Sequence, residues 1–257
     1  MSLMEEKFPS PLDATSVSEG WLRACQLIRA APGHTMYYLL VRIHNPLQRR
    51  VEIDGPYDAF CQARRLPCLE GVASTIFPET FYRFHCSGNV ERLFEGFKQY
   101  RKKVGMIFRK QLDFSYFDRL IHWQPVGAAP VNQLAIFIER MNEYRYRYEA
   151  WYFYPTIDPT RDLRKIRGGP CLSAVDVKYE RDRNRLHLFA FYRDHDFESK
   201  ALGNYIGLCD LQRFLCEQIG AEVGALHCFS LRARIGGLAP REFRTLLDEL
   251  SVLVKPG

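Results

Sequence analysis

A cysteine at a rigid turn is the first residue in this sequence whose type and place indicate chemistry. Cys171 lies in the run 168–172 (GGPCL), directly before a stretch with the pattern of a strand. A thiol in such a turn is held near the surface, and its thiolate form is a nucleophile. Four upstream basic residues are expected to favour the thiolate: Arg161, Arg164, Lys165 and Arg167. The alternative is a structural cysteine, because a free cysteine usually behaves as a small buried hydrophobe.

A second group of polar residues begins where another predicted strand ends. Arg193 closes that strand, His195 and Asp196 follow it, and Asn204 opens the next predicted helix. A guanidinium can bind a phosphate with two hydrogen bonds, and a carboxamide can both donate to and accept from a ring edge. His195 could assist proton transfer or fill an ordinary loop role. The alternative for the whole group is a helix cap within a surface salt-bridge network.

The elements that must position these residues are predicted from hydrophobic periodicity and turn residues. The predicted helices cover residues 19–30, 89–104, 131–141, 203–219 and 240–253. The predicted strands cover residues 36–43, 148–154, 173–180, 185–193 and 224–231, and the third and fourth form a hairpin. Strands and helices are mixed without regular βαβ alternation. This predicts an α+β fold, with helices packed on one face of a mixed sheet.

Composition and charge restrict the class of protein. The chain has 257 residues, and its 47% of hydrophobic residues excludes disorder. We expect one domain over residues 1–257, with a loose polar lead at 1–16. Apolar runs are too short to span a membrane. Eight cysteines without a CxxC pair favour a reducing, cytoplasmic location and no metal site. The net charge of +6 suits an anionic small ligand rather than nucleic acid.

The order of these motifs resembles the thymidylate synthase superfamily, which includes the pyrimidine nucleotide hydroxymethylases. The shared order is a Pro-Cys turn, a strand hairpin, Arg193, Asp196 three residues later, and Asn204 eight residues after that, opening an amphipathic helix. The resemblance covers about residues 131–235. It implies a thymidylate synthase-like mixed sheet and a homodimer formed through that sheet.

The resemblance also implies roles for individual residues. Cys171 corresponds to the nucleophile that adds to C6 of the pyrimidine, so that C5 can attack the methylene of 5,10-methylenetetrahydrofolate. Arg193 corresponds to the arginine that binds the nucleotide phosphate and the thiolate. Asp196 corresponds to the aspartate near the pyrimidine O2 and the folate. Asn204 corresponds to the asparagine that pairs with N3 and O4 of uracil.

Further residues are implied at the edges of the site. Arg147, with Arg145, corresponds to arginines that reach the phosphate of the partner subunit. Lys200 stands where the family has a glycine that makes room for the folate. Other departures from the family pattern are Leu172 for a histidine, Asp194 for a serine, and the run 234–236 for the sugar-binding His-x-Tyr.

Three functions follow as hypotheses. The leading one is a methyl- or hydroxymethyltransferase that acts at C5 of a pyrimidine 5′-nucleotide. The second is a catalytically idle relative that binds nucleotides or serves as a scaffold, which the altered folate residues favour. The third is a nucleic-acid binder, which requires a basic face and a steep salt dependence.

Overall fold

A seven-stranded mixed sheet forms the centre of the computed structural model, which describes residues 10–107, 115–124, 127–144, 152–164, 168–236 and 240–254. The strands are β1 (Leu12–Ala14), β2 (Thr35–Ile43), β3 (Phe153–Pro155), β4 (Leu172–Glu180), β5 (Arg185–Tyr192), β6 (His195–Asp196) and β7 (Glu222–Arg234). Their order is β1-β2-β7-β5-β4-β3, and β6 pairs with β7. Three pairs are antiparallel (β2/β7, β3/β4, β4/β5) and three are parallel (β1/β2, β5/β7, β6/β7). The α+β class with a mixed sheet is therefore confirmed.

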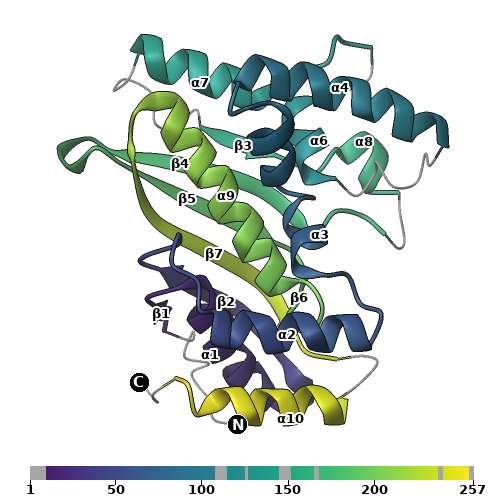
Figure 1. Cartoon of the computed structure of the whole chain (residues 1–257), viewed down its shortest axis with the longest axis vertical. Helices are drawn as coiled ribbons and strands as arrows, with labels where there is room; N and C mark the ends of the chain where they lie inside the picture. Colours follow the sequence, from purple (N-terminus) through teal and green to yellow (C-terminus); the bar gives the residue numbers. More distant parts are fainter. Residues whose placement is uncertain are drawn as a thin grey trace, which may run out of the picture.

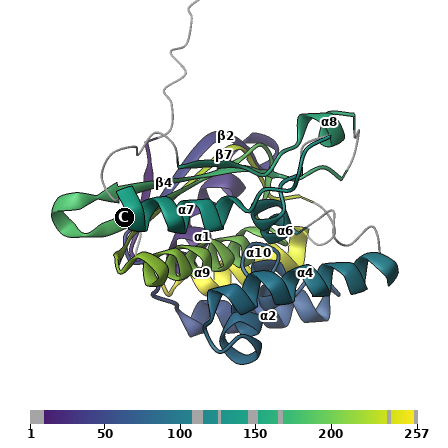
Figure 2. The same cartoon turned by 90° about the horizontal axis from the view of Figure 1, so that it is seen from above.

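The helices lie mainly along one side of this sheet, as the view from above shows (Figure 2). They are α1 (Val17–Ala30), α2 (Val51–Ala63), α3 (Leu69–Ala73), α4 (Val90–Ile107), α6 (Tyr116–Ile121), α7 (Gln133–Tyr144), α8 (Pro159–Asp162), α9 (Ala201–Ile219) and α10 (Pro240–Ser251). A π-helical turn covers Phe81–His85, and 3₁₀ turns cover Pro32–His34 and Arg181–Arg183. None of the helices in the described ranges is long and apolar enough to cross a bilayer.

The helix α9 runs diagonally across the sheet in front of β5 and β7 (Figure 1). Its side chains are buried almost all the way round, which is typical of a helix enclosed between two layers. Gly203 and Gly207 face α3 on its outer side. A Cβ at Gly207 would lie 2.5 Å from the carbonyl oxygen of Ala73, and a Cβ at Gly203 would lie 2.6 Å from Cβ of Val72. The two glycines therefore let α3 approach α9 closely.

The predicted hairpin is present and consists of β4 and β5. Val177 lies opposite Leu188, and both side chains are buried, whereas the alternate positions face the other side of the sheet. Asn184 adopts the left-handed conformation (φ 49°) at the turn, and its Oδ1 accepts a hydrogen bond from the hydroxyl of Tyr179 (2.6 Å). Asparagine tolerates this conformation better than most residues, so the turn residue fits the hairpin.

The strands β1 and β6 were not predicted, and β7 is longer than predicted. Residues 12–14, within the stretch expected to be a loose lead, form β1 because Leu12 and Ala14 bury their side chains beside β2. The strand β7 continues three residues beyond the predicted end at Leu231, since β6 pairs with its last residues. This extension brings Arg234 to the end of the sheet where β6 and the start of α9 lie.

The loop between β6 and α9 is held from below by two buried aromatic residues. The indole Nε1 of Trp21 donates to the carbonyl of Phe197 (3.0 Å), and the hydroxyl of Tyr57 donates to the carbonyl of Glu198 (2.9 Å). Trp21 is fully buried. These contacts fix the segment that carries Asp196.

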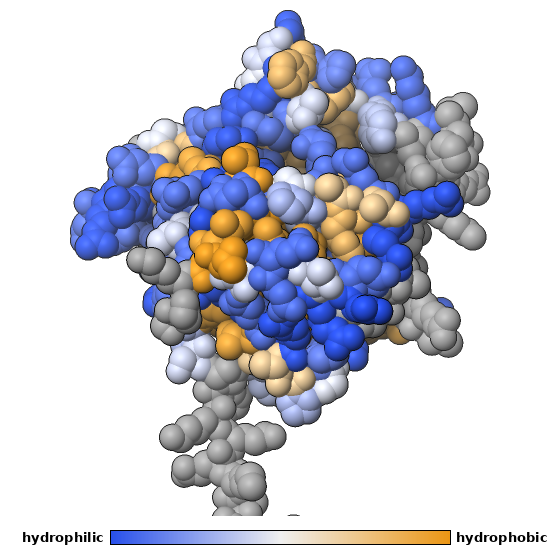
Figure 3. All heavy atoms as spheres, turned by 60° about the horizontal axis from the view of Figure 1, so that its bottom comes forward, coloured by the Kyte–Doolittle hydropathy of each residue, from blue (hydrophilic) through white to orange (hydrophobic). Residues whose placement is uncertain are grey.

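The end of the molecule that bears α1 and α10 shows apolar surface gathered among hydrophilic side chains (Figure 3).

Candidate functional site

A cavity of about 330 Å³ opens between α3, the start of β4 and the loop that leads into α9. Four of the predicted site residues lie on its walls: Cys171, Asp196, Lys200 and Asn204. The other lining residues are Pro67, Gly71, Val72, Thr75, Tyr116, Gly168, Gly169, Pro170, Asp194, His195 and Arg234. The structure thus brings five segments of the chain to one space: residues 67–75, Tyr116, residues 168–171, residues 194–204 and Arg234.

Backbone hydrogen bonds hold Cys171 directly before the first residue of β4. The backbone N–H groups of Cys171 and Leu172 both donate to the hydroxyl oxygen of Tyr116, at 3.0 and 3.2 Å. The Cys171 carbonyl accepts from the backbone N–H of Arg193 (3.0 Å). Both lone pairs of the Tyr116 oxygen are thereby used, so its O–H remains a donor beside the thiol. The half-buried thiol lines the cavity.

The electrostatic surroundings of Cys171 differ from the sequence expectation. Burial raises the pKa of the thiol above its ordinary value of 9.0, and Asp194 raises it further. Lys200, Arg193 and Arg234 lower this pKa but do not outweigh burial. The neutral thiol is therefore the resting form at neutral pH.

The upstream basic cluster does not supply these cations. Arg161 pairs with Asp158 through a 2.8 Å contact, while Lys165 and Arg167 lie outside the described residues. The cluster was expected to favour the thiolate, but the pKa of the thiol is raised, because desolvation is the largest influence on the group.

Arg193 places its guanidinium over the glycine turn. A Cβ at Gly169 would come within 2.5 Å of Nη2 of Arg193, so the absence of a side chain there makes room for the guanidinium. Within the described ranges the Arg193 side chain has no carboxylate partner, and it is exposed. Its charge is therefore available to an anion at the rim of the cavity.

Asp194 occupies a position where a free carboxylate would repel a phosphate. Its Oδ2 accepts a hydrogen bond from Nε of Arg234 (3.2 Å), and its Oδ1 contacts Nη1 of Arg232 at 3.4 Å. Two arginines of β7 thus neutralise the carboxylate. These ion pairs reduce the repulsion that the carboxylate would exert on a nearby anion.

Asp196 organises the start of α9. Its Oδ1 accepts hydrogen bonds from the backbone N–H groups of Glu198 (3.0 Å) and Ser199 (3.2 Å), and its Oδ2 accepts from the hydroxyl of Ser199 (2.9 Å). Nη2 of Arg234 lies 4.0 Å from Oδ2. The carboxylate is therefore anchored by its own loop, with Oδ2 retaining capacity for one more donor.

Asn204 is held by a buried histidine. Its Nδ2 donates to Nε2 of His195 (3.1 Å), and Nδ1 of His195 lies 3.0 Å from the hydroxyl of Ser230. The imidazole stacks on the ring of Tyr192, with centroids 3.8 Å apart and planes 4° from parallel. Burial lowers the pKa of His195 to about 3, so the ring is neutral. The expectation of an ordinary loop histidine missed this buried network.

The sequence did not identify Tyr116 and Arg234, which line the cavity, or Ser230, which lies behind it against His195. Each comes from a segment far from Cys171 in the chain, and only the packing of α6 and β7 brings them close. Arg145 and Arg147, predicted to reach a partner subunit, lie outside the described residues.

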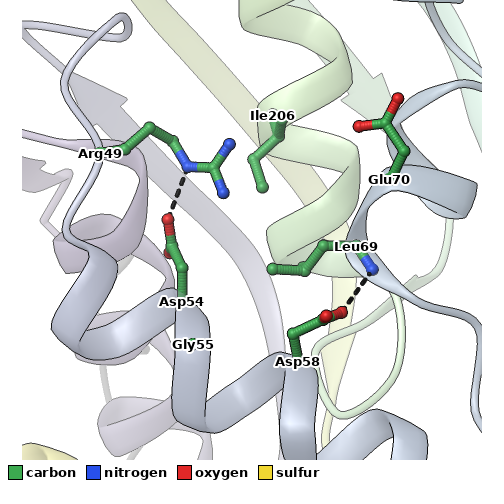
Figure 4. Close-up of a pocket in the computed structure, with 7 residues that line it drawn as sticks. All are labelled: Arg49, Asp54, Gly55, Asp58, Leu69, Glu70 and Ile206. Carbon is green, nitrogen blue, oxygen red and sulfur yellow. Dashed lines mark hydrogen bonds and ion pairs between the residues drawn. The ribbon is translucent and has the colours of Figure 1, made fainter. Parts of the chain in front are cut away.

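A second pocket, of about 290 Å³, lies between α2, α3 and α9 (Figure 4). Arg49 reaches into it and binds Asp54 through Nε (2.6 Å), and Asp54 also accepts from the hydroxyl of Ser18 (2.8 Å). Asp58 accepts from the backbone N–H of Leu69 (3.0 Å). These carboxylates join α2 to its neighbours, so the pocket is built from structural contacts.

The comparisons with known proteins point to one group of relatives. No family model matches the chain. The chain is 28% identical over 149 residues to "Putative thymidylate synthase" from Methanosarcina mazei, which covers 57% of this chain and 62% of that protein. A protein of the same name from Methanococcoides burtonii is 28% identical over 128 residues, 49% of this chain and 54% of that protein. With both, the match spans less than two thirds of the relative.

The relative from Methanosarcina acetivorans, which carries the same name, matches over a larger share of the chain. It is 28% identical over 246 residues, which covers 90% of this chain and 93% of that protein. The chain therefore has a distant, thymidylate synthase-like relationship to these proteins.

Proposed function

We propose that the protein transfers a one-carbon unit to C5 of a pyrimidine 5′-nucleotide. The observation that carries this proposal is the meeting of a thiol, Cys171, and a carboxamide, Asn204, on the walls of one cavity bordered by cations. The names of the distant relatives support the same class of transferase in nucleotide biosynthesis.

The proposed chemistry begins with the thiolate of Cys171. A bond forms between Sγ and C6 while the C5–C6 π electrons move toward C5, which becomes nucleophilic. C5 then bonds to the one-carbon unit and loses its proton, and the bond between that unit and the nitrogen of its donor breaks. A hydride from the reduced folate, or a water oxygen, then adds to the transferred carbon to give a methyl or a hydroxymethyl group, and the Sγ–C6 bond breaks to release the thiolate and restore the ring. Because the thiol is neutral at rest, a base must take its proton. Lys200, Arg193 and Arg234 favour the thiolate that results.

The remaining groups are proposed to bind the substrate. Asn204 would read the base edge, with its carboxamide accepting from N3–H and donating to O4 of uracil. Arg193 would bind the 5′-phosphate with its guanidinium, which has no ion-pair partner in the described part of the chain. Arg145 and Arg147 would complete the phosphate site of a partner subunit, and these two roles stay predictions.

The proposed donor is 5,10-methylenetetrahydrofolate, which supplies a one-carbon unit at the methylene oxidation level when bound. The residues present fit such an anionic pteridine in two respects. Lys200 is exposed at the rim without an ion pair among the described residues and would bind a carboxylate. Asp196 has capacity left on Oδ2 for a ring N–H donor.

A homodimer through the sheet is part of the proposal. The face opposite α9 carries partly exposed aromatic side chains on neighbouring strands: Phe153, Phe189, Phe191 and Phe229. Aromatic and apolar residues on an open sheet face are typical of a subunit interface. Sedimentation of the wild type should give a dimer, and Phe191→Asp should give a monomer; a monomeric wild type would contradict it. The cytoplasmic location stays a prediction.

A catalytically idle nucleotide-binding protein is the second candidate. The raised thiol pKa favours it, because a neutral thiol is a poor nucleophile. Leu172, at a position where the family has a histidine, points the same way.

Tritium release separates the two candidates. Nucleotides labelled at C5 (dUMP, UMP, dCMP and CMP) are incubated with the protein, with and without methylenetetrahydrofolate. We expect release from one of them, and a loss of at least about 1,000-fold with Cys171→Ser. Cys68→Ser is the matched control, because Cys68 is an exposed cysteine that caps α3 and does not line the cavity. Nucleotide binding without any release would favour the idle protein.

A further inference from the structure

The imidazole of His195 lies between two side chains that differ in their distance from the cavity. On its inner side Nδ1 meets the hydroxyl of Ser230 at 3.0 Å, and on its outer side Nε2 meets Nδ2 of Asn204 at 3.1 Å. All three residues are buried, with exposed fractions of 1% for His195, 0% for Ser230 and 5% for Asn204. Of the three, His195 and Asn204 line the cavity.

A neutral imidazole carries one N–H, so its two nitrogens cannot both donate. Nδ2 of Asn204 is a donor, which makes Nε2 of His195 the acceptor and places the ring proton on Nδ1. That proton is then donated to the Ser230 hydroxyl oxygen. The Ser230 hydroxyl also contacts the thiol of Cys228. The chain of hydrogen bonds therefore has one direction, from Asn204 through the ring to Ser230.

Rotating the Asn204 carboxamide by 180° would disrupt this chain. It would bring Oδ1 against the lone pair of Nε2, leaving two buried acceptors without a donor. Restoring the hydrogen bond would require the ring to move its proton to Nε2 and Ser230 to turn its hydroxyl. The ring itself is clamped flat against Tyr192.

The carboxamide orientation matters because uracil and cytosine present opposite edges. Uracil offers a donor at N3 and an acceptor at O4, whereas cytosine offers an acceptor at N3 and a donor at N4. A carboxamide that is free to rotate can satisfy either base, while one held in a single orientation satisfies one of them in a given pose.

We propose that His195 is a positioning residue that holds Asn204 in one orientation, so that the site distinguishes uracil from cytosine nucleotides. This inference rests on the proposed function, in which Asn204 reads the base. It adds that selectivity comes from a buried partner of the reading residue and not from that residue alone. Ser230 is part of the device, because its oxygen accepts the Nδ1 proton while its hydroxyl contacts the thiol of Cys228.

The first test measures dissociation constants of UMP and CMP, and of their deoxy forms, for the wild type and two variants. His195→Phe keeps the stacking on Tyr192 and removes the acceptor. Ser230→Ala removes the partner of Nδ1 and leaves Asn204 and His195 in place. We expect the wild type to prefer the uracil nucleotide, and both variants to reduce the ratio of the two constants by about tenfold.

Tyr192→Phe is the matched control. Among the described residues the Tyr192 hydroxyl is buried without a hydrogen-bond partner, so its removal leaves the stacked ring and the chain of hydrogen bonds intact. We expect an unchanged base ratio. An unchanged ratio in His195→Phe and Ser230→Ala, with the wild type still selective, would overturn the inference and leave the proposed function standing.

The second test needs no nucleotide. Nitrogen-15 NMR of the histidine-labelled protein should show His195 protonated on Nδ1 and unprotonated on Nε2 at pH 7. Protonation on Nε2 would overturn the inference. A wild type that binds none of the nucleotides would remove both the proposed function and the base-reading role, whichever tautomer the spectrum shows.

Discussion

Two pockets of similar size border α3 and α9, and they differ in what their polar groups do. In the pocket of Figure 4, Asp54 and Asp58 bind donors of the protein itself. In the cavity at Cys171, the Arg193 guanidinium and the Lys200 ammonium have no ion-pair partner among the described residues, and Asn204 has hydrogen-bonding capacity left. Volume alone would not separate the two. Uncommitted polar groups mark the cavity as the functional one.

The largest expected effect on stability comes from the close contact between α3 and α9, the two helices that border both pockets. Gly207→Val would place a side chain 2.5 Å from the backbone oxygen of Ala73, and backbone atoms cannot move aside locally. We expect α3 to be displaced and the free energy of unfolding to fall by about 3 kcal/mol. Chemical denaturation measures this.

Gly55→Ala is the control for this substitution. Gly55 also lies in a helix and borders the Figure 4 pocket, but a Cβ there meets no atom within 4 Å. We expect unchanged or slightly increased stability, by up to about 1 kcal/mol. Equal losses in the two variants would contradict the role given to the α3–α9 contact.

Lowering the pH should change the free energy of unfolding in opposite directions through two buried groups, His195 beside the cavity and Asp210 near Arg49. His195 has a pKa of about 3 in the folded protein against 6.5 in the unfolded chain, so the unfolded state binds more protons below pH 6.5. Its contribution to stability is lost as the pH falls from 6.5 toward 3. We expect the wild type to lose about 3 kcal/mol relative to His195→Phe between pH 7 and pH 4.

Asp210, which lies near Arg49, has a folded pKa raised to about 6 by burial. Its folded state therefore takes up the proton first, and stability rises as the pH falls from 6 toward 3.8. Asp210→Asn should remove that gain. For His195, the contradicting result would be a free energy of unfolding that depends on pH in the same way in the wild type and in His195→Phe.

A substitution with a smaller effect tests whether the Figure 4 pocket stabilises the fold or binds the nucleotide. Asp54→Ala removes the carboxylate that joins Arg49 and Ser18 in the Figure 4 pocket. We expect a loss of about 2 kcal/mol in the free energy of unfolding, because hydrogen bonds to a buried charge are lost. Nucleotide dissociation constants should not change. A weakened nucleotide affinity would show that this pocket is part of the site.

The smallest effect concerns the rim of the cavity. Gly169→Ala would place a methyl group on the guanidinium of Arg193, which can swing away because it ends a flexible side chain. We expect stability to change little and nucleotide affinity to fall by about tenfold, while the affinity for the matching nucleoside, which lacks the phosphate, stays the same. Equal losses for nucleotide and nucleoside would contradict a phosphate role for Arg193.

Much of the C-terminal half could be predicted from the sequence. The hairpin of β4 and β5 alternates around a polar turn from Val175 onward, and α9 ends at Gly220 in the left-handed conformation, so local patterns specify both. The helix α2 was not predicted, because Pro56 lies inside it and proline usually ends a helix pattern. The five-residue helix α3 depends on tertiary packing for its stability.

The candidate site was predictable only in part, for a physical reason. The spacing of Cys171, Arg193 and Asn204 is a property of the chain, but their surroundings depend on the fold. The raised pKa of Cys171 comes from burial, and the orientation of Asn204 comes from Ser230 on a distant strand. Neither desolvation nor a contact between distant segments can be inferred from local residue patterns.

A crystal structure with a bound uridine nucleotide tests the central claim most directly. The account predicts the base inside the cavity, with Sγ of Cys171 below C6, the Asn204 carboxamide at the N3–O4 edge and the phosphate against Arg193. A nucleotide bound elsewhere, or bound in the cavity with its C6 turned away from Cys171, would contradict the account.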